Sequence, residues 1–371
     1  MDIADLLIQT KEKNASDLHI SAGSPPMMRL HGDLTPVEPA PLTRDGVHRM
    51  IYEILNDDQR RLFEENRDLD FAIELGDVAR FRVNVFNQKN GEGAVFRVIP
   101  TQIRTFQELG LPEVVASLSS RENGLVLVTG PTGSGKSTTL AAMIDYVNTH
   151  FKKHVITLED PIEFVHKTKS CLVNQREIGP HTKSFASALR AALREDPDVI
   201  LVGEMRDLET ISLALTAAET GHLVFGTLHT KSAPKTIDRV IDAFPPAQQQ
   251  QIRVQLSEAL QGVVSQLLLP TKDKKGRVAA LEIMIATVAI RNLIREGKTH
   301  QMPSSIQTGT QLGMQSLEQA LKNLVMQGRV DKAHADAILQ STAAASTAAA
   351  LGGPAAGGPA GGAHAPAVAA R

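Results

Sequence analysis

The stretch GLVLVTGPTGSGKSTTL, residues 124–140, decides the fold class of this chain. Its beginning is apolar enough for a strand buried on both faces, its middle is rich in glycine, and its end has the composition of a helix. A strand, a glycine loop and a helix in this order gather backbone N–H groups and a helix N-terminus around one point. The stretch therefore predicts an α/β domain that binds phosphate.

The loop itself, GPTGSGKS at residues 130–137, matches the whole pattern G-x-x-x-x-G-K-[ST] of nucleotide-binding loops. We expect Lys136 to reach the β and γ phosphates of ATP, and Ser137 to give a hydroxyl oxygen to Mg²⁺. The alternative, a plain glycine-rich turn, leaves the flanking strand and helix unexplained. ATP and Mg²⁺ are the predicted cofactors, and the predicted cofactor-binding residues of the loop are Gly130, Pro131, Thr132, Gly133, Ser134, Gly135, Lys136, Ser137 and Thr138.

Three more apolar stretches end where a glycine or polar residue begins a loop. They are HVITLED at 154–160, DVILVGE at 198–204 and HLVFGTLHT at 222–230. Strands of this kind are typical of a mostly parallel sheet covered by helices on both faces. In such sheets ligands lie at the carboxyl ends of the strands, so the polar residues that follow these strands are candidates for catalysis.

Two acidic positions stand out at these strand ends. Glu204 follows the second stretch, where phosphate-loop enzymes place the acid that orders the attacking water, so we predict it as catalytic base and as a Mg²⁺ contact. Gly203 stands where an aspartate is usual, which weakens the Mg²⁺ assignment. The cluster LEDPIEF at 158–164 adds Glu163 as a second catalytic candidate. The alternative for both glutamates is a solvated loop side chain.

The remaining sequence divides into four parts. Residues 1–100 predict a small α+β domain, 101–112 a linker, 113–340 the ATPase domain and 341–371 a disordered tail of mainly Ala, Gly and Pro. After about residue 235 the chain is expected to be mainly helical, with amphipathic stretches at 246–269 and 316–327. Within the first part we predict helices near 3–7 and 47–66, a proline-rich connection at 24–41, and strands at 17–20, 70–75, 79–88 and 92–100.

Composition narrows the classes of function. A net charge of -2 over 371 residues gives no global field to hold a nucleic acid, and an aromatic fraction of 4% gives few bases a stacking platform. One cysteine, Cys171, allows neither an intramolecular disulfide nor a thiolate zinc cage. The N-terminus has no features of a secretory signal, and no stretch reaches the roughly 20 apolar residues of a membrane span, so we expect a cytoplasmic protein.

Taken together, GPTGSGKSTTL, LEDPIEF, DVILVGEMRDLETI and TAAETGHLVFGTLHT resemble the Walker A, Asp box, Walker B and His box of the secretion ATPase superfamily. In that superfamily a glycine before the Walker B glutamate is usual, so Gly203 becomes a match. Three further motifs, NASDLHISAG at 14–23, VARFRVNVFNQ at 78–88 and AIRNLIREGK at 289–298, closely resemble the type IV pilus retraction ATPases. The resemblance covers residues 1 to about 340.

The resemblance implies a PAS-like N-terminal domain and a RecA-like ATPase domain assembled into a homohexameric ring. It further implies a motor docked on the inner-membrane platform protein of the pilus machine, working beside other pilus ATPases. His222 and His229, which bracket one strand, would sense the γ-phosphate, His229 in catalysis and His222 in cofactor binding. Arg82 and Arg97 of the small domain would reach the nucleotide as catalytic residues.

Several alternatives stay open at this point. The accessory retraction ATPases share these motifs, whereas assembly and type II secretion ATPases usually carry a four-cysteine zinc insertion that this chain lacks. A RecA-like nucleic-acid translocase and a nucleotide switch without hydrolysis are candidates from other classes. The histidines and arginines also have ordinary structural explanations, as does the AIRNLIR run, which is associated with retraction in the family but has the composition of a basic amphipathic helix.

Overall fold

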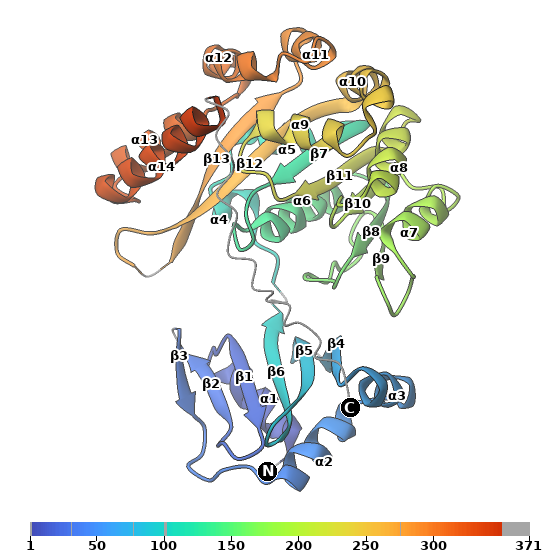
Figure 1. Ribbon diagram of the computed structural model, residues 1–371, viewed down its shortest axis with the longest axis vertical. Helices are drawn as coiled ribbons and strands as arrows, with labels where there is room; N and C mark the ends of the chain where they lie inside the picture. Colours follow the sequence, from blue (N-terminus) through green and yellow to red (C-terminus); the bar gives the residue numbers. More distant parts are fainter. Residues whose placement is uncertain (1, 31, 77, 100–101, 275, 351–371) are drawn as a thin grey trace, which may run out of the picture.

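The computed structural model describes residues 2–30, 32–76, 78–99, 102–274 and 276–350. These residues form two units, each built on its own sheet, which we call the N-terminal unit (2–99) and the C-terminal unit (102–350) (Figure 1). Among them no helix is both long and apolar enough to cross a bilayer.

The N-terminal unit is a six-stranded antiparallel sheet in the order β3-β2-β1-β6-β5-β4. Alternation along β5 buries Phe81, Val83 and Val85 completely and turns Arg82 outward, as a period of two requires. The elements are α1 (Ile3–Glu12), β1 (Asp17–Ser21), β2 (Met27–Leu30), β3 (Asp33–Pro36), α2 (Arg44–Ile54), α3 (Asp57–Asn66), β4 (Asp68–Leu75), β5 (Ala79–Gln88) and β6 (Gly91–Ile99).

Two predictions for this unit need correction. The single helix expected over 47–66 is two helices, because Leu55 is extended and Asn56 starts α3 with a capping box to Gln59. The connection expected over 24–41 contains β2 and β3, which are four residues each and carry no clear alternation of apolar and polar residues. Strands this short are stabilised by pairing with neighbours and leave little periodic signal.

The C-terminal unit is a seven-stranded sheet in the order β13-β12-β7-β11-β10-β8-β9. All neighbouring pairs are parallel except β12 with β13. The predicted α/β class is therefore confirmed. The strands are β7 (Gly124–Thr129), β8 (His154–Glu159), β9 (Leu172–Glu177), β10 (Val199–Val202), β11 (Leu223–Leu228), β12 (Leu260–Pro270) and β13 (Arg277–Ile285).

Helices cover both faces of this sheet (Figure 1). Val126 and Val128 of β7 pack toward α5 and α6, whereas Leu125 and Leu127 pack toward the helices of the other face, so every residue of the strand is buried. The helices are α4 (Phe106–Leu109), α5 (Glu113–Ser119), α6 (Lys136–His150), α7 (Phe185–Ala192), α8 (Leu208–Glu219), α9 (Ala233–Asp242), α10 (Pro246–Ala259), α11 (Val288–Arg295), α12 (Met302–Thr308), α13 (Leu317–Met326) and α14 (Lys332–Ala350), with 3₁₀ turns at Thr299–Gln301 and Thr310–Leu312.

The expectation of a mainly helical chain after residue 235 is confirmed by α9 to α14, but it missed the two strands β12 and β13. The stretch 246–269 is a helix only as far as Ala259, and Leu260 begins β12, which lies between β7 and β13. A continuous apolar run cannot distinguish a buried strand from a buried helix, and the run around Val263 is of that kind. Strand β9 was not predicted either, because its exposed, polar residues resemble a loop.

The predicted linker and tail also differ from the structure. Residues 101–112 include the short helix α4, whose Phe106 is buried in the core of the C-terminal unit. Helix α14 extends to Ala350, so disorder is the wrong prediction for 341–350, where alanine's high helix propensity continues the helix. The predicted disorder of 351–371 lies outside the described residues.

Candidate active site

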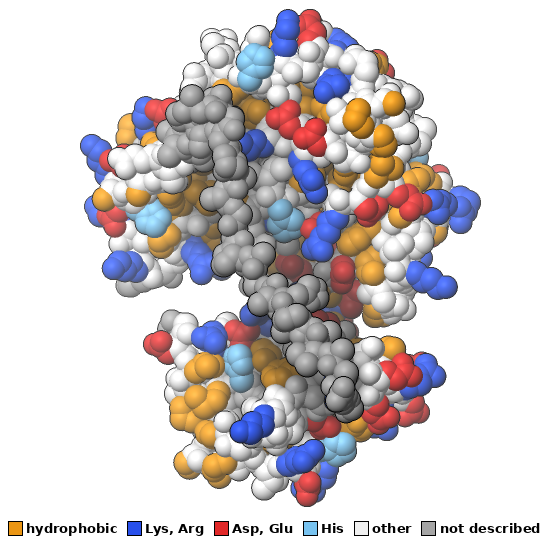
Figure 2. Space-filling model, viewed as in Figure 1, with side chains coloured by type: hydrophobic (Ala, Val, Ile, Leu, Met, Phe, Trp, Pro, Cys, Tyr) orange, Lys and Arg blue, Asp and Glu red, His pale blue; other side chains and the backbone are white. Residues whose placement is uncertain are grey.

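A cleft of about 590 Å³ lies where the carboxyl ends of β7, β8, β10 and β11 face β5 and β6 of the N-terminal unit. Figure 2 shows acidic and basic side chains along the hollow between the two units. The lining residues are Arg82, Arg97, Val98, Ile99, Thr132, Gly133, Gly135, Lys136, Ser137, Thr138, Leu140, Ala141, Glu159, Asp160, Pro161, Glu163, Phe164, His166, Phe185, Leu201, Gly203, Glu204, Thr227, His229 and Leu268.

The phosphate loop forms one wall of this cleft and is preshaped for an anion. Gly133 and Gly135 have φ of +77° and +89°, a region that disfavours side chains, and a Cβ at Gly133 would meet open space. Gly135 is the N-cap of α6, and no side chain of the described chain caps this helix. The first N–H groups of the helix are therefore available to a phosphate in the cleft.

Lys136 and Ser134 test whether the residues present suit such a ligand. The Lys136 Nζ donates to the carbonyls of Gly130 (2.9 Å) and Pro131 (3.2 Å). Burial lowers the pKa of Lys136, while the charges of Glu204 and Glu163 oppose that shift. The Ser134 hydroxyl oxygen is buried with no partner among the described residues. A cation beside a buried hydroxyl and free amides suits a phosphate group.

Glu204 and His229 meet at the adjacent strand ends. Glu204 follows β10, His229 follows β11, and the Glu204 Oε1 lies 2.9 Å from the His229 Nε2. Arg206 forms an ion pair with the same oxygen. Burial alone would raise the pKa of Glu204, but the hydrogen bond and charge of Arg206, helped by His229, hold it below the usual value. Glu204 is thus a carboxylate held ionised by Arg206 and oriented by both Arg206 and His229.

The structure gives a physical reason for glycine at position 203. Its N–H donates to the Leu158 carbonyl at 2.8 Å, and a Cβ there would lie 2.9 Å from that oxygen and 3.3 Å from the Glu159 Cα. There is no room for the aspartate usual in this position. The neighbouring carboxylate is Glu159, whose pKa is raised by burial even though Thr157 and Gln175 donate hydrogen bonds to it.

Glu163 lies in the loop after β8, exposed, and its backbone N–H is 3.4 Å from the Glu159 Oε2. The start of this loop is held by Glu177 of β9, whose Oε2 accepts the Ile162 N–H at 3.1 Å. The same oxygen lies 3.1 Å from the Arg80 Nη2 of the N-terminal unit. The acidic loop is therefore tied to both units.

Arg82 and Arg97 reach the cleft from the N-terminal unit. They are directly opposite each other on β5 and β6, and their side chains are 45% and 69% exposed. Like charges in opposite positions destabilise a sheet unless an anion compensates them. Asp70 (3.9 Å from Arg82) and Asp17 (2.8 Å from Arg97) do so in part, and both guanidinium groups remain accessible to a second anion.

Four predicted residues do not line the cleft: Gly130, Pro131 and Ser134 belong to the phosphate loop beside it, whereas His222 lies far from it. His222 precedes β11, whereas the cleft lies at the other end of that six-residue strand, about 20 Å away at the usual rise per residue. Its Nδ1 is 2.9 Å from the Ala217 carbonyl, and it does not line the cleft. For the cleft of a single chain, the prediction that His222 binds the cofactor must be corrected.

Two residues at or beside the cleft were missed by the sequence analysis. His166 lines the cleft and is 8% exposed, and Arg206 does not line it but pairs with Glu204, which does. Neither position has a motif of its own. Only the spacing of Arg206 from Glu204 could have drawn attention to it.

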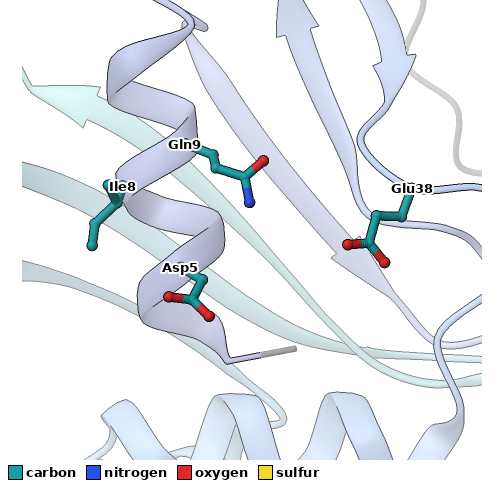
Figure 3. Close-up of a pocket in the computed structure, with 4 residues that line it drawn as sticks. All are labelled: Asp5, Ile8, Gln9 and Glu38. Carbon is teal, nitrogen blue, oxygen red and sulfur yellow. The ribbon is translucent and has the colours of Figure 1, made fainter.

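A second hollow lies on the N-terminal unit, far from these residues. Figure 3 shows Asp5, Ile8 and Gln9 on α1, with Glu38 across from them. Its two carboxylates have no buried cation beside them, and no role follows from it.

Comparisons with known proteins place the chain in a family. The family model described as "Type II/IV secretion system protein" matches residues 2–337. The type IV pilus retraction ATPase PilT of Pseudomonas aeruginosa is 61% identical over 335 residues, which cover 90% of this chain and 97% of PilT. The type IV pilus ATPase PilU of the same organism is 43% identical, covering 91% of this chain and 89% of PilU.

A solved structure, that of the pilus retraction motor PilT with bound ADP, superimposes on this chain with a TM-score of 0.85 and 50% identity. The superposition covers 90% of this chain and 96% of that one. Both the sequence relatives and the solved structure are thus matched over nearly their whole length. The chain belongs to the type II/IV secretion system protein family, within the secretion ATPase superfamily.

Proposed function

We propose that this chain is an ATPase motor that powers type IV pilus retraction and, through it, twitching motility. The observation that carries the proposal is the cleft, in which the phosphate loop of one unit faces Arg82 and Arg97 of the other. The 61% identity to a pilus retraction ATPase over nearly its full length supports the assignment of the work done.

We assign the following roles to the chain's own residues. The loop amides, Lys136 and Thr138 bind the β and γ phosphates. Ser137 and Glu204 would hold Mg²⁺, which would neutralise charge on the phosphate oxygens. Glu204 orients the attacking water as base, with Glu163 close by and His229 holding the Glu204 carboxylate in place. Arg82 and Arg97 stabilise charge on the transferred phosphoryl group, an effect worth about 10³ to 10⁵ in rate for such arginines.

The working form we propose is a homohexameric ring in the cytoplasm, docked on the inner-membrane platform protein of the pilus and working beside other pilus ATPases. Residues 1–100 would form the PAS-like domain, 101–112 the linker and 113–340 the RecA-like ATPase domain. Closure of the cleft on ATP and its reopening after hydrolysis would move the two units and drive pilin depolymerisation.

The two alternatives are less well supported. An accessory retraction ATPase would be expected to match PilU better than PilT, and the identities are 43% and 61%. A nucleic-acid translocase needs a basic track, whereas Figure 2 shows basic and acidic side chains interspersed on the visible face.

The test is Lys136→Ala, in the purified protein and in the chromosome. The purified variant is expected to lose ATP hydrolysis, and the strain to become non-motile with excess surface pili. Undiminished turnover would reject the site, whereas lost turnover with normal twitching would reject the assignment to retraction.

A further inference from the structure

Gln266 of β12 lies beneath the phosphate loop, and nothing in the motifs points to it. It is 4% exposed and does not belong to the lining of the cleft. Its Nε2 donates to the Ser134 carbonyl at 2.6 Å, and its Oε1 accepts from the Thr139 hydroxyl at 2.8 Å. One side chain therefore joins the loop to the first turn of α6.

The loop is built closely around this residue. A Cβ at Gly130 would lie 2.2 Å from the Gln266 carbonyl oxygen, and one at Gly135 would lie 2.7 Å from the Gln266 Nε2. The parallel pairing of β12 with β7, which joins Ser265 to Thr129, brings Gln266 to this point. Two of the loop's glycines are thus required by contact with Gln266 as well as by their positive φ.

The side-chain amide makes both of these hydrogen bonds at once, because its NH₂ group donates while its oxygen accepts. The carbonyl of Ser134 requires a donor and the hydroxyl of Thr139, itself 2% exposed, is given an acceptor. A glutamate would place a charge against the Ser134 carbonyl, and a methionine of similar length would supply neither bond.

We propose that Gln266 is a positioning residue that keeps the phosphate loop in its anion-binding shape before nucleotide arrives. This inference rests on the proposed ATPase function. Amides that converge on an empty site repel one another, and Lys136 is already turned toward the carbonyls of Gly130 and Pro131. The two hydrogen bonds of Gln266 oppose collapse of the loop. They therefore strengthen the binding of any phosphate tail and do not change the rate of the chemical step.

The experiment compares Gln266→Met with the parent protein in steady-state ATPase assays and in calorimetric titration with Mg-ADP. We expect KM for ATP and Kd for ADP to rise together by about tenfold, the loss of roughly one good hydrogen bond, while kcat stays within about threefold. Thr139→Val should change KM in the same direction, and Thr139→Ser, which keeps the hydroxyl, should restore it.

The matched control is Gln315→Met. The Gln315 Nε2 also donates to a backbone carbonyl, that of Leu281 at 2.8 Å, but away from the loop. A lower melting temperature with parental KM is expected for this control. The same pattern in Gln266→Met, or in Thr139→Val if Gln266→Met fails to fold, would overturn the proposal. Lys136→Ala distinguishes failure of this proposal from failure of the proposed ATPase function. Full ATPase activity in Lys136→Ala would reject the proposed function itself.

Discussion

Glu204 illustrates how a catalytic carboxylate is kept both ionised and fixed. Arg206 and His229 approach the same oxygen, so the carboxylate has one preferred orientation and a lowered pKa. A carboxylate held ionised at neutral pH can accept a hydrogen bond from the attacking water and orient it at any physiological pH, while its lowered pKa makes it a weaker proton acceptor. Its position, opposite Lys136 across the cleft, is what the Walker B motif led us to expect, and its partners are new.

Glu204→Gln is expected to bind ATP and to slow hydrolysis by about 10² to 10⁴, since an amide keeps the shape of the side chain but cannot take the proton. A single-turnover assay with labelled ATP measures this directly. Glu209→Gln, which changes an exposed carboxylate paired with Arg190, serves as control and should retain parental rates. Rapid product formation by Glu204→Gln would remove this residue from the role of base.

His166 should make stability depend on pH. Burial lowers its pKa from 6.5 to about 4, with Asp145 and Lys169 acting in opposite directions, and its Nδ1 has no partner among the described residues. As the pH falls below 6.5 the unfolded chain takes up a proton that the folded chain refuses until about pH 4. This residue should therefore lower the free energy of unfolding by up to about 3 kcal/mol across that range.

The measurement is denaturant unfolding of the parent and of His166→Gln between pH 7.5 and pH 4. The difference between the two free energies of unfolding should be constant above pH 7 and shift steadily below it. A difference independent of pH would contradict the assigned pKa.

At the scale of elements, α11 contains a residue, Arg291, that stabilises the end of the neighbouring helix α10. The Arg291 guanidinium donates to the carbonyls of Ser257, Glu258 (2.7 Å) and Ala286 (2.9 Å). Two of these belong to the last turn of α10, where helix carbonyls lack partners. Arg291 therefore caps one helix from another, and joins α10 to the end of β13.

Arg291→Ala should lower the free energy of unfolding by about 2 kcal/mol, because it leaves these carbonyls without their charged donor. ATPase activity per folded molecule should persist, since the cleft is elsewhere, while retraction is expected to be lost. Thermal unfolding and a twitching assay test the two parts. Lys298→Ala, at an exposed lysine paired with Glu296, should leave the melting temperature unchanged. A normal melting temperature in Arg291→Ala would contradict the capping role.

The elements that could be predicted from sequence are those with a strong local pattern. Strand β7 and helix α6 can be predicted from the apolar residues on either side of a glycine loop. Strand β5 can be predicted from its strict alternation of apolar and polar residues. Strand β12 could not be assigned, because its apolar run is compatible with either state until β7 is there to pair with it. Gln266 was missed for the same reason, since its partners are more than 100 residues away in sequence.

At the scale of the whole molecule, one buried ion pair connects the two units. Arg80 and Glu177 have side-chain exposures of 12% and 6%, and their charged atoms are 3.1 Å apart. Because Glu177 also accepts the Ile162 N–H, the pair joins the N-terminal sheet to the acidic loop. Removing Arg80 leaves the buried Glu177 carboxylate without its cation, whereas removing Glu177 leaves Arg80 with only the more distant Glu74, 3.8 Å away.

A double-mutant cycle with Arg80→Met and Glu177→Gln tests this connection. Each single change should lower the free energy of unfolding by about 3 kcal/mol, and the double change by clearly less than the sum, a coupling of at least about 1 kcal/mol. The exposed pair Arg61 and Asp58 offers a control cycle with coupling near zero. Additive effects at Arg80 and Glu177 would mean that the pair does not couple the units.

The two units have separate hydrophobic cores, one drawn from residues 3–96 and the others from residues 106–335. Tilting one unit against the other therefore uncovers no core side chain, and the restoring force comes from a few polar contacts. The molecule thus combines two units, each with its own core, and a joint made of polar contacts such as the Arg80–Glu177 ion pair. Small chemical changes at the cleft can therefore move one unit relative to the other.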